Sequence, residues 1–238
     1  MKISFFYPCH NEEKNIEKLV EETYRFAKNH FEKFEIIVVD DGSKDRTAEI
    51  ATKLTQKYPE VRLIQHPKNK GYGAALITGF HAAKYEYIFY TDGDGQFVID
   101  ELAKHLDKIN SGTVLSGYRA DRKDPLMRKI NAFIFNVAYN IFFLNTFRDI
   151  DCSFKVYPRW VIEKINMRCT GALIDGEMLV KSKRLGLKVV QFPVEHLPRV
   201  HGIQSGAKLK VILKAMREFI FLWFHIKTWT VLTFRRVI

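Results

Sequence analysis

The sequence YEYIFYTDGDGQ, residues 85–96, decides the fold class. Its first seven residues are mostly aromatic or β-branched, a composition that predicts a buried strand. Asp92 and Asp94 follow that strand, and two carboxylates one residue apart repel each other unless a cation lies between them. A Mg²⁺ or Mn²⁺ ion that also binds a diphosphate would supply this positive charge, because hard divalent ions prefer oxygen ligands. An isolated Asp-Gly-Asp is also common in exposed turns, so its surroundings must decide.

Outward from this strand, the first 120 residues alternate between strand and helix patterns. The expected strands are 3–7, 35–40, 61–65, 85–91 and 113–117, and the expected helices are 16–27, 47–58, 72–83 and 100–109. Such alternation predicts an α/β fold, a mainly parallel sheet flanked by helices, whose ligands collect at the carboxyl ends of the strands. The polar residues of segments 8–13, 40–47 and 92–96 all fall at those ends.

The second half of the chain is less regular. We expect an aromatic helix near 130–147, strands at 153–157 and 189–194, a helix around 176–185, a basic loop and a long helical C-terminus. No linker interrupts the sequence. We therefore expect a catalytic domain over residues 1–206 and an amphipathic helical segment over 207–238.

Composition limits the partners and the compartment. The net charge of +11 on 238 residues favours anionic partners without choosing among phosphates, nucleic acid and an acidic membrane. No nucleic-acid recognition motif is present, so we expect no such partner. Three scattered cysteines argue against a disulfide framework and fit a reducing cytosol. The chain starts directly on a strand pattern, so no signal peptide is expected.

Four ordered blocks carry a family resemblance: VVDDGSKDRT at 38–47, NKGYGAA at 69–75, DGDGQ at 92–96 and SGYR at 116–119. With the segment PCHNEE at 8–13, they make the chain resemble the family 2 glycosyltransferases of GT-A fold. Within that family it is similar to the dolichyl- or polyprenyl-phosphate sugar synthases, of the dolichyl-phosphate mannose synthase type. The resemblance covers roughly residues 3–206.

The resemblance implies roles for individual residues. Those implied for the nucleotide sugar are Pro8, His10, Glu12, Asp40, Asp41, Asp92, Asp175, Glu177, His201 and Ser205. The implied metal ligands, for Mg²⁺ or Mn²⁺, are Asp92, Asp94 and Gln96. The implied catalytic set is Asp94 with Arg119, Arg128 and Arg199, whose guanidinium groups suit phosphate oxygens. Segment 149–155 has Cys152 and Ser153 where many relatives have Ser or Thr followed by Gly, which leaves the sugar open.

The implied reaction moves a hexose from a nucleotide sugar to a polyprenyl phosphate, with GDP-mannose the first choice of donor and UDP-glucose the second. A phosphate acceptor is already anionic and attacks without a general base, whereas a sugar hydroxyl needs one. Asp175 and Glu177 are present at the position where hydroxyl-using relatives carry a base, so this alternative stays open. A transferase elongating a cell-surface glycan and a non-catalytic scaffold are therefore the rival functions.

An apolar stripe marks the C-terminal segment: Leu209, Ile212, Leu213, Met216, Phe219, Ile220, Trp223 and Phe224 recur at helical spacing, with Lys and Arg largely off the stripe. A basic amphipathic helix of this kind suits the surface of an anionic membrane. Packing on the catalytic domain or on a second copy is the alternative. We expect a peripheral enzyme on the cytoplasmic face of a membrane. A separate membrane subunit and a homo-oligomer are both open as further partners.

Overall fold

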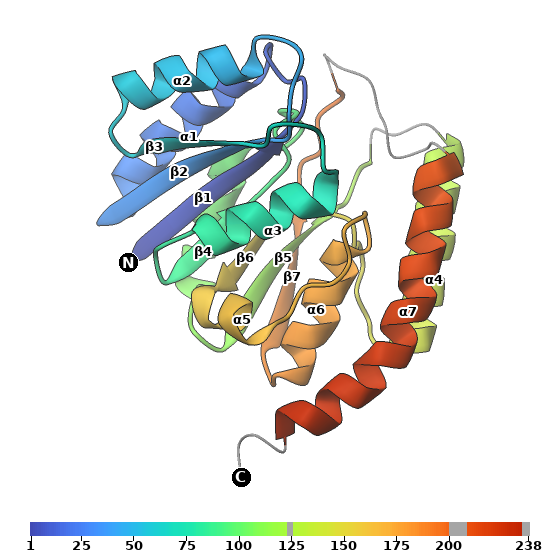
Figure 1. Cartoon of the computed structure of the whole chain (residues 1–238). Helices are drawn as coiled ribbons and strands as arrows, with labels where there is room; N and C mark the ends of the chain where they lie inside the picture. Colours follow the sequence, from blue (N-terminus) through green and yellow to red (C-terminus); the bar gives the residue numbers. More distant parts are fainter. Residues whose placement is uncertain (123–125, 200–208, 235–238) are drawn as a thin grey trace.

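A seven-stranded sheet organises the molecule (Figure 1). The computed structural model describes residues 1–122, 126–199 and 209–234. The spatial order of the strands is β3-β2-β1-β4-β6-β5-β7. Their bounds are Lys2–Cys9 (β1), Lys33–Asp40 (β2), Val61–Gln65 (β3), Tyr87–Tyr90 (β4), Thr113–Arg119 (β5), Lys155–Pro158 (β6) and Lys188–Val194 (β7). All neighbours pair in parallel except β6, which is antiparallel to both β4 and β5. The predicted α/β class with a mainly parallel sheet is confirmed.

The strands are apolar on both faces, so each face carries its own core. Side chains alternate along a strand: in β1, Phe5 packs into one core and Phe6 into the other. Helices α1 (Ile16–His30) and α2 (Thr47–Lys57) and the 3₁₀ helix η1 (Ile99–Lys108) cover the Phe5 face. Helices α3 (Tyr72–Ala82), α5 (Arg159–Lys164) and α6 (Ile174–Arg184) cover the Phe6 face.

The antiparallel strand β6 matters for the site. It lies between β4 and β5, with Tyr90 opposite Lys155. Because the two strands run in opposite directions, the segment before β6 reaches the same edge of the sheet as the residues after β4. Helix α5, which directly follows β6, is absent from the sequence expectations, since six residues are too few to show a helical period.

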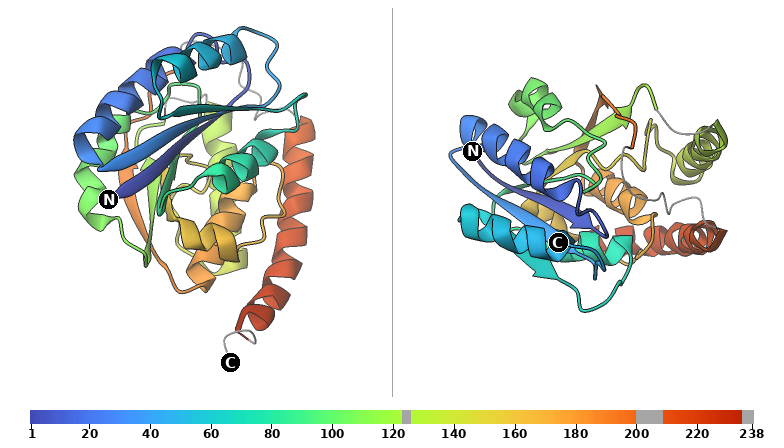
Figure 2. Two further views of the ribbon diagram at one scale, coloured as in Figure 1. Left: turned by 60° about the vertical axis from the view of Figure 1, so that its left-hand side comes forward. Right: turned by 90° about the horizontal axis from the view of Figure 1, so that it is seen from above.

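Helices α4 (Leu126–Phe143) and α7 (Leu209–Phe234) run side by side at one end of the molecule (Figure 2). Phe219 of α7 packs against Phe135, Tyr139 and Phe143 of α4. Leu222 and Ile226 of α7 are buried in the core on the Phe6 face. One side of α7 therefore packs on the domain, while Leu213, Met216, Ile220 and Phe224 are exposed. Within the described residues, no helix has the length and apolarity needed to cross a membrane.

A close helix–strand approach gives a test of this packing. A Cβ atom at Gly79 of α3 would overlap the ring of Phe6, which is fully buried. Helix propensity alone favours Ala over Gly by about 1 kcal/mol, but overpacking costs roughly 1–3 kcal/mol. We expect Gly79→Ala to lower the free energy of unfolding measured in urea. Phe6→Leu in the same background should recover part of the loss, and a stabilised Gly79→Ala protein would contradict the packing described.

Candidate active site at the carboxyl edge of the sheet

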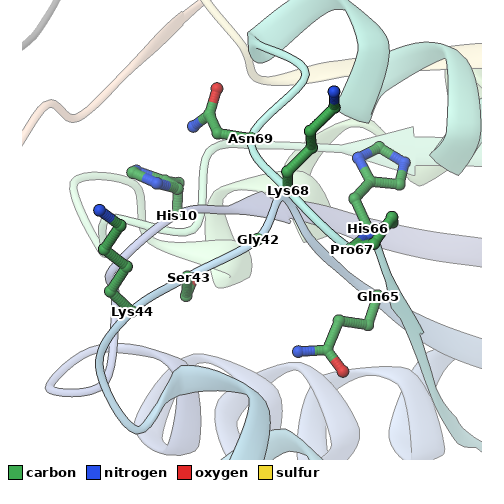
Figure 3. Close-up of a pocket in the computed structure, with 9 residues that line it drawn as sticks. All are labelled: His10, Gly42, Ser43, Lys44, Gln65, His66, Pro67, Lys68 and Asn69. Carbon is green, nitrogen blue, oxygen red and sulfur yellow. The ribbon is translucent and has the colours of Figure 1, made fainter.

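The loops after β1, β2 and β3 enclose a cavity of about 640 Å³ (Figure 3). His10 comes from the first loop, Gly42, Ser43 and Lys44 from the second, and residues 65–69 from the end of β3 and its loop. Predicted residue His10 therefore lines a pocket, as expected for a ligand at the carboxyl edge of a parallel sheet. Pro8 lies behind it, buried, and its carbonyl accepts a hydrogen bond from Gly93 N at 3.3 Å.

Asp40 and Asp41 lie at the end of β2, directly before the pocket residues Gly42 and Ser43. Both are buried. Asp40 accepts hydrogen bonds from Ser43 N and Gln65 Nε2, both at 3.0 Å. Asp41 contacts His66 Nδ1 at 2.7 Å and accepts from the backbone N–H groups of residues 70 and 71. These carboxylates thus hold the pocket's own loops in place, and Asp40 keeps lone pairs for a further donor.

The loop after β1 is tied to the loop after β2. Asn11 has φ of 60°, a left-handed conformation that Asn tolerates. Its N–H donates to Ser43 Oγ at 2.9 Å, and its Oδ1 accepts from Lys44 N at 2.8 Å. Glu12 N donates to Thr47 Oγ1 at 2.8 Å. The two predicted nucleotide-pocket segments are therefore one connected unit.

The predicted metal ligands Asp92, Asp94 and Gln96 lie directly after β4. Gly93 is required between them, because a Cβ there would lie 2.5 Å from Cys9 Sγ. The Oδ1 atom of Asp92 is buried and has no hydrogen-bond partner among the residues that the structure describes. Burial, and then the charge of Asp94, raises the pKa of Asp92 to about 7. A buried carboxylate oxygen without a partner is costly unless a ligand binds it.

Arg199 supplies a positive charge to this group from the segment after β7. Its guanidinium contacts Asp94 Oδ2 at 3.2 Å and Glu12 Oε1 at 2.6 Å. Leu197, two residues earlier, exchanges hydrogen bonds with Gln96: its N–H donates to the Gln96 carbonyl, and its own carbonyl accepts from Gln96 Nε2, both at 2.9 Å. The predicted residues Glu12, Asp94, Gln96 and Arg199 are thus brought together, with Arg199 where a cation is needed.

A divalent ion fits this arrangement only together with a ligand of its own. Among the described residues, no group of three or more His, Cys, Asp and Glu side chains could hold a metal. Two carboxylates with the amide oxygen of Gln96 form an incomplete oxygen set of the kind that Mg²⁺ completes with substrate phosphates. The unpartnered Asp92 oxygen and the Arg199–Asp94 ion pair both mark a place that attracts positive charge.

Two arginines, Arg119 and Arg128, are predicted to bind the acceptor phosphate, and the structure describes the side chain of the first only. Arg119 forms a bidentate ion pair with Asp149, with both N–O distances 2.7 Å, and is buried. Arg122, which the sequence analysis did not single out, lies 3.7 Å from the same carboxylate. The side chain of Arg128, at the start of α4, and the residues His201 and Ser205 lie outside the described part of the chain.

The two carboxylates at the start of α6 are already engaged. Asp175 Oδ1 pairs with Lys155 Nζ at 3.0 Å and accepts from the Tyr90 hydroxyl, while Oδ2 accepts from the Tyr72 hydroxyl at 3.4 Å. Glu177 is fully buried on another side of α6. It pairs with Lys181 at 2.5 Å and accepts from the backbone N–H groups of residues 168 and 169. The structure therefore does not bring Glu177 to the other predicted residues.

Sequence comparison shows which known proteins the chain is similar to. The family model for Glycosyl transferase family 2 matches residues 4–165. A dolichyl-phosphate beta-glucosyltransferase of Trichomonas vaginalis is 31% identical over 225 residues, covering 88% of this chain and 68% of the relative. A second one is 34% identical, covering 81% and 63%. An undecaprenyl-phosphate 4-deoxy-4-formamido-L-arabinose transferase of Photorhabdus laumondii is 28% identical, covering 89% and 65%.

Comparison of structures supports the fold. Glucosyl-3-phosphoglycerate synthase from Mycobacterium tuberculosis superposes with a TM-score of 0.69 at 19% identity, covering 93% of this chain and 78% of the other. A second structure of that enzyme, in complex with Mn²⁺, UDP and glucosyl-3-phosphoglycerate, gives a TM-score of 0.69 at 18% identity with the same coverage. At this identity the likeness shows the GT-A fold alone.

The Arg199–Asp94 contact predicts competition with a divalent cation. Removing the guanidinium in Arg199→Ala leaves Asp94 and Glu12 without this cation. We expect the variant to bind Mn²⁺ more tightly in the absence of nucleotide, by about 1 kcal/mol as for a partly exposed pair, measured by titration calorimetry. Arg62→Ala, which breaks an ion pair with Glu35 at the opposite edge, is the control. Unchanged or weaker Mn²⁺ binding in Arg199→Ala would show that the guanidinium does not compete.

Proposed function

The chain belongs to glycosyl transferase family 2, and we propose that it transfers a hexose from a nucleotide sugar to a polyprenyl phosphate. UDP-glucose is the first donor to consider and GDP-mannose the second. This reverses the order expected from the sequence, because relatives at 29–34% identity are dolichyl-phosphate beta-glucosyltransferases. The relatives that act on undecaprenyl phosphate support the acceptor class rather than the sugar.

One observation carries the choice of acceptor: the oxygens of Asp175 and Glu177 are committed to lysines and internal hydrogen bonds. A hydroxyl acceptor requires a carboxylate that reaches the hydroxyl and takes its proton. Asp175 is 3% exposed and paired with Lys155, and Glu177 is 0% exposed and paired with Lys181. A phosphate monoester needs no such base, since its own oxygen is already anionic and can attack the anomeric carbon directly.

The residues at the sheet edge divide the remaining work. We assign the nucleotide to the pocket of His10, Asp40 and Asp41, and the donor diphosphate to Asp92, Asp94 and Gln96 through Mg²⁺ or Mn²⁺. These three residues would hold the ion, which would supply positive charge to the leaving diphosphate. Arg199 lies beside Asp94 and is suited to move from that carboxylate to the diphosphate. Positioning and electrostatics then carry a single displacement with inversion.

The acceptor phosphate is assigned to the arginines near α4. Arg119 is fixed by Asp149, so it presents a rigid guanidinium with donors left over for a phosphate oxygen. Arg122 lies beside the same carboxylate, and Arg128 is in the first turn of α4, the helix that carries much of the exposed apolar surface. His201 and Ser205, which lie outside the described residues, stay predictions for the nucleotide sugar. In this proposal the acceptor phosphate binds near the start of α4, next to the helix that carries the exposed apolar side chains.

That apolar face is proposed to meet the membrane. The α4–α7 apolar face consists of Leu126, Met127, Phe133, Ile134, Ile141 and Phe142 on α4 and Leu213, Met216, Ile220 and Phe224 on α7, all exposed. Exposed Lys129 and Arg217 accompany it. So many exposed apolar side chains on two adjacent helices are unusual on a soluble monomer, and exposed basic residues on the same helices favour an anionic bilayer.

The reaction is tested by label transfer from a nucleotide sugar to a short polyprenyl phosphate in detergent with Mg²⁺ or Mn²⁺. We expect label from UDP-glucose in the organic phase and little or none when polyprenol replaces the phosphate. Asp94→Ala should lower the rate at least about a hundredfold, because it removes the charge that holds the leaving diphosphate. GDP-mannose and UDP-N-acetylglucosamine are run in parallel.

The outcomes of that assay separate the rival functions. Transfer to glycan hydroxyls, with none to polyprenyl phosphate, would establish the glycan-elongating activity instead. The absence of metal-dependent binding of every nucleotide sugar tested would indicate a non-catalytic scaffold. Transfer from GDP-mannose alone would keep the acceptor and change the sugar.

Membrane docking is tested with charge on the α4–α7 apolar face. Phe133→Glu with Phe224→Glu places two carboxylates on exposed apolar positions, and we expect co-sedimentation with vesicles of anionic lipid to fall several-fold. Thr52→Glu with Gln56→Glu makes the same charge change on exposed positions of α2 and should have much less effect. Equal losses in the two double variants would show that net charge alone accounts for membrane binding.

A further inference from the structure

Asp151 is a carboxylate that the assignments above leave unused. It lies just before β6, and the antiparallel pairing of β6 with β4 puts its segment at the edge where Asp92 and Asp94 follow β4. The contact is direct at Ser153, whose hydroxyl accepts a hydrogen bond from Asp92 N at 3.2 Å. Asp151 is two residues before Ser153 and is not among the residues that line the cavity of Figure 3.

The two neighbouring carboxylates are each paired with a cationic side chain, whereas one oxygen of Asp151 has no partner among the described residues. Asp149 is paired with Arg119, and Asp175 with Lys155. Asp151 Oδ1 is buried and has no hydrogen-bond partner within the described part of the chain. Burial, and then the charge of Asp175, raises the pKa of Asp151 to about 6. A buried acceptor left without a donor is destabilising, so this oxygen is suited to accept a hydrogen bond from a ligand.

The charges around Asp151 restrict what that donor is. Asp175 and Asp149 lie close enough to affect its ionisation, while Arg119 and Lys155 are held by these same two carboxylates. An anionic group, such as a phosphate, is therefore disfavoured beside it. A metal ion would need further carboxylate or imidazole ligands, and the described residues offer no such group. A neutral molecule with several hydroxyl donors fits, and the hexose of the donor is such a molecule.

We propose that Asp151 accepts a hydrogen bond from a ring hydroxyl of the transferred hexose and so selects among hexoses. The inference rests on the proposed function, because it takes the donor to be a nucleotide sugar. Selection follows from physical chemistry: a hexose lacking that hydroxyl, or carrying it in the other orientation, leaves the buried carboxylate unpaired, and sites of this kind discriminate strongly.

The test compares a nucleotide with and without its sugar. Affinities of wild type and Asp151→Ala for UDP and for UDP-glucose are measured by calorimetry with Mn²⁺. We expect UDP affinity to change less than twofold and UDP-glucose affinity to fall roughly tenfold or more, the usual effect of a hydrogen bond to a charged group. Asp151→Asn, which keeps an acceptor oxygen, should lose less. The melting temperature of the Asp151→Asn variant should not fall, because the substitution removes a buried charge.

A control variant and a double-mutant cycle complete the test. Glu60→Ala removes another carboxylate with a buried, unpartnered oxygen, located before β3 at the opposite edge, and should leave both affinities unchanged. Among UDP-deoxyglucose analogues, one should bind wild type and Asp151→Ala equally, which identifies the hydroxyl. If wild type binds neither UDP nor UDP-glucose, the proposed donor fails, and the comparison is made with GDP and GDP-mannose.

Two results would overturn the proposal. Equal losses of UDP and UDP-glucose affinity would assign Asp151 to the nucleotide or to the fold. Unchanged UDP-glucose affinity with loss of transfer would make Asp151 a base or a positioning residue instead of a sugar ligand.

Discussion

The structure depends on one electrostatic constraint: many carboxylates lie at the carboxyl edge of a single sheet. Parallel strands bring their ends to one edge, and here the segments after β2 and β4, before β6 and at the start of α6 all place Asp residues there. Each buried carboxylate must be paired, hydrogen-bonded or bound to a ligand, since an isolated buried charge is unstable. The way each one is compensated separates structural residues from those left for substrate.

Compensation within the chain accounts for most of these groups. His66 and backbone N–H groups hold Asp41, Arg119 holds Asp149, and Lys155 holds Asp175. Asp94 is paired with a residue from another loop, Arg199, and Asp92 and Asp151 each keep a buried oxygen without a partner among the described residues. The first group fixes the shape of the site. The second group is what the enzyme offers to a metal–diphosphate and, in our proposal, to a hexose.

The sequence predicted the fold better than the chemistry of the site. Alternating apolar periods gave the strand and helix order and located Asp92 and Asp94 correctly at a strand end, because these signals are local. The role of Lys155 could not be predicted from such local signals, because a lysine in a strand is expected to be exposed. In the structure its side chain is 0% exposed and contacts the Tyr90 hydroxyl. Only the antiparallel insertion of β6, a tertiary feature, brings it to Asp175. Lys181 carried a usable signal, since it lies four residues after Glu177 on one helix.

The central claim is that the acceptor's own phosphate is the nucleophile and that no enzyme carboxylate removes its proton. The rate of transfer as a function of pH tests this claim directly when two acceptors are compared, a polyprenyl phosphate and a fluorinated phosphonate analogue with a lower second pKa. A phosphate monoester has its second pKa near ~6. The account predicts that the acidic limb of the profile moves to lower pH with the pKa of the acceptor. The profiles are measured with donor and metal ion saturating, so that Asp92 and Asp151, whose pKa values are raised in the free protein, are already ligated. Under these conditions, a limb that stays at the same pH with both acceptors would contradict the account.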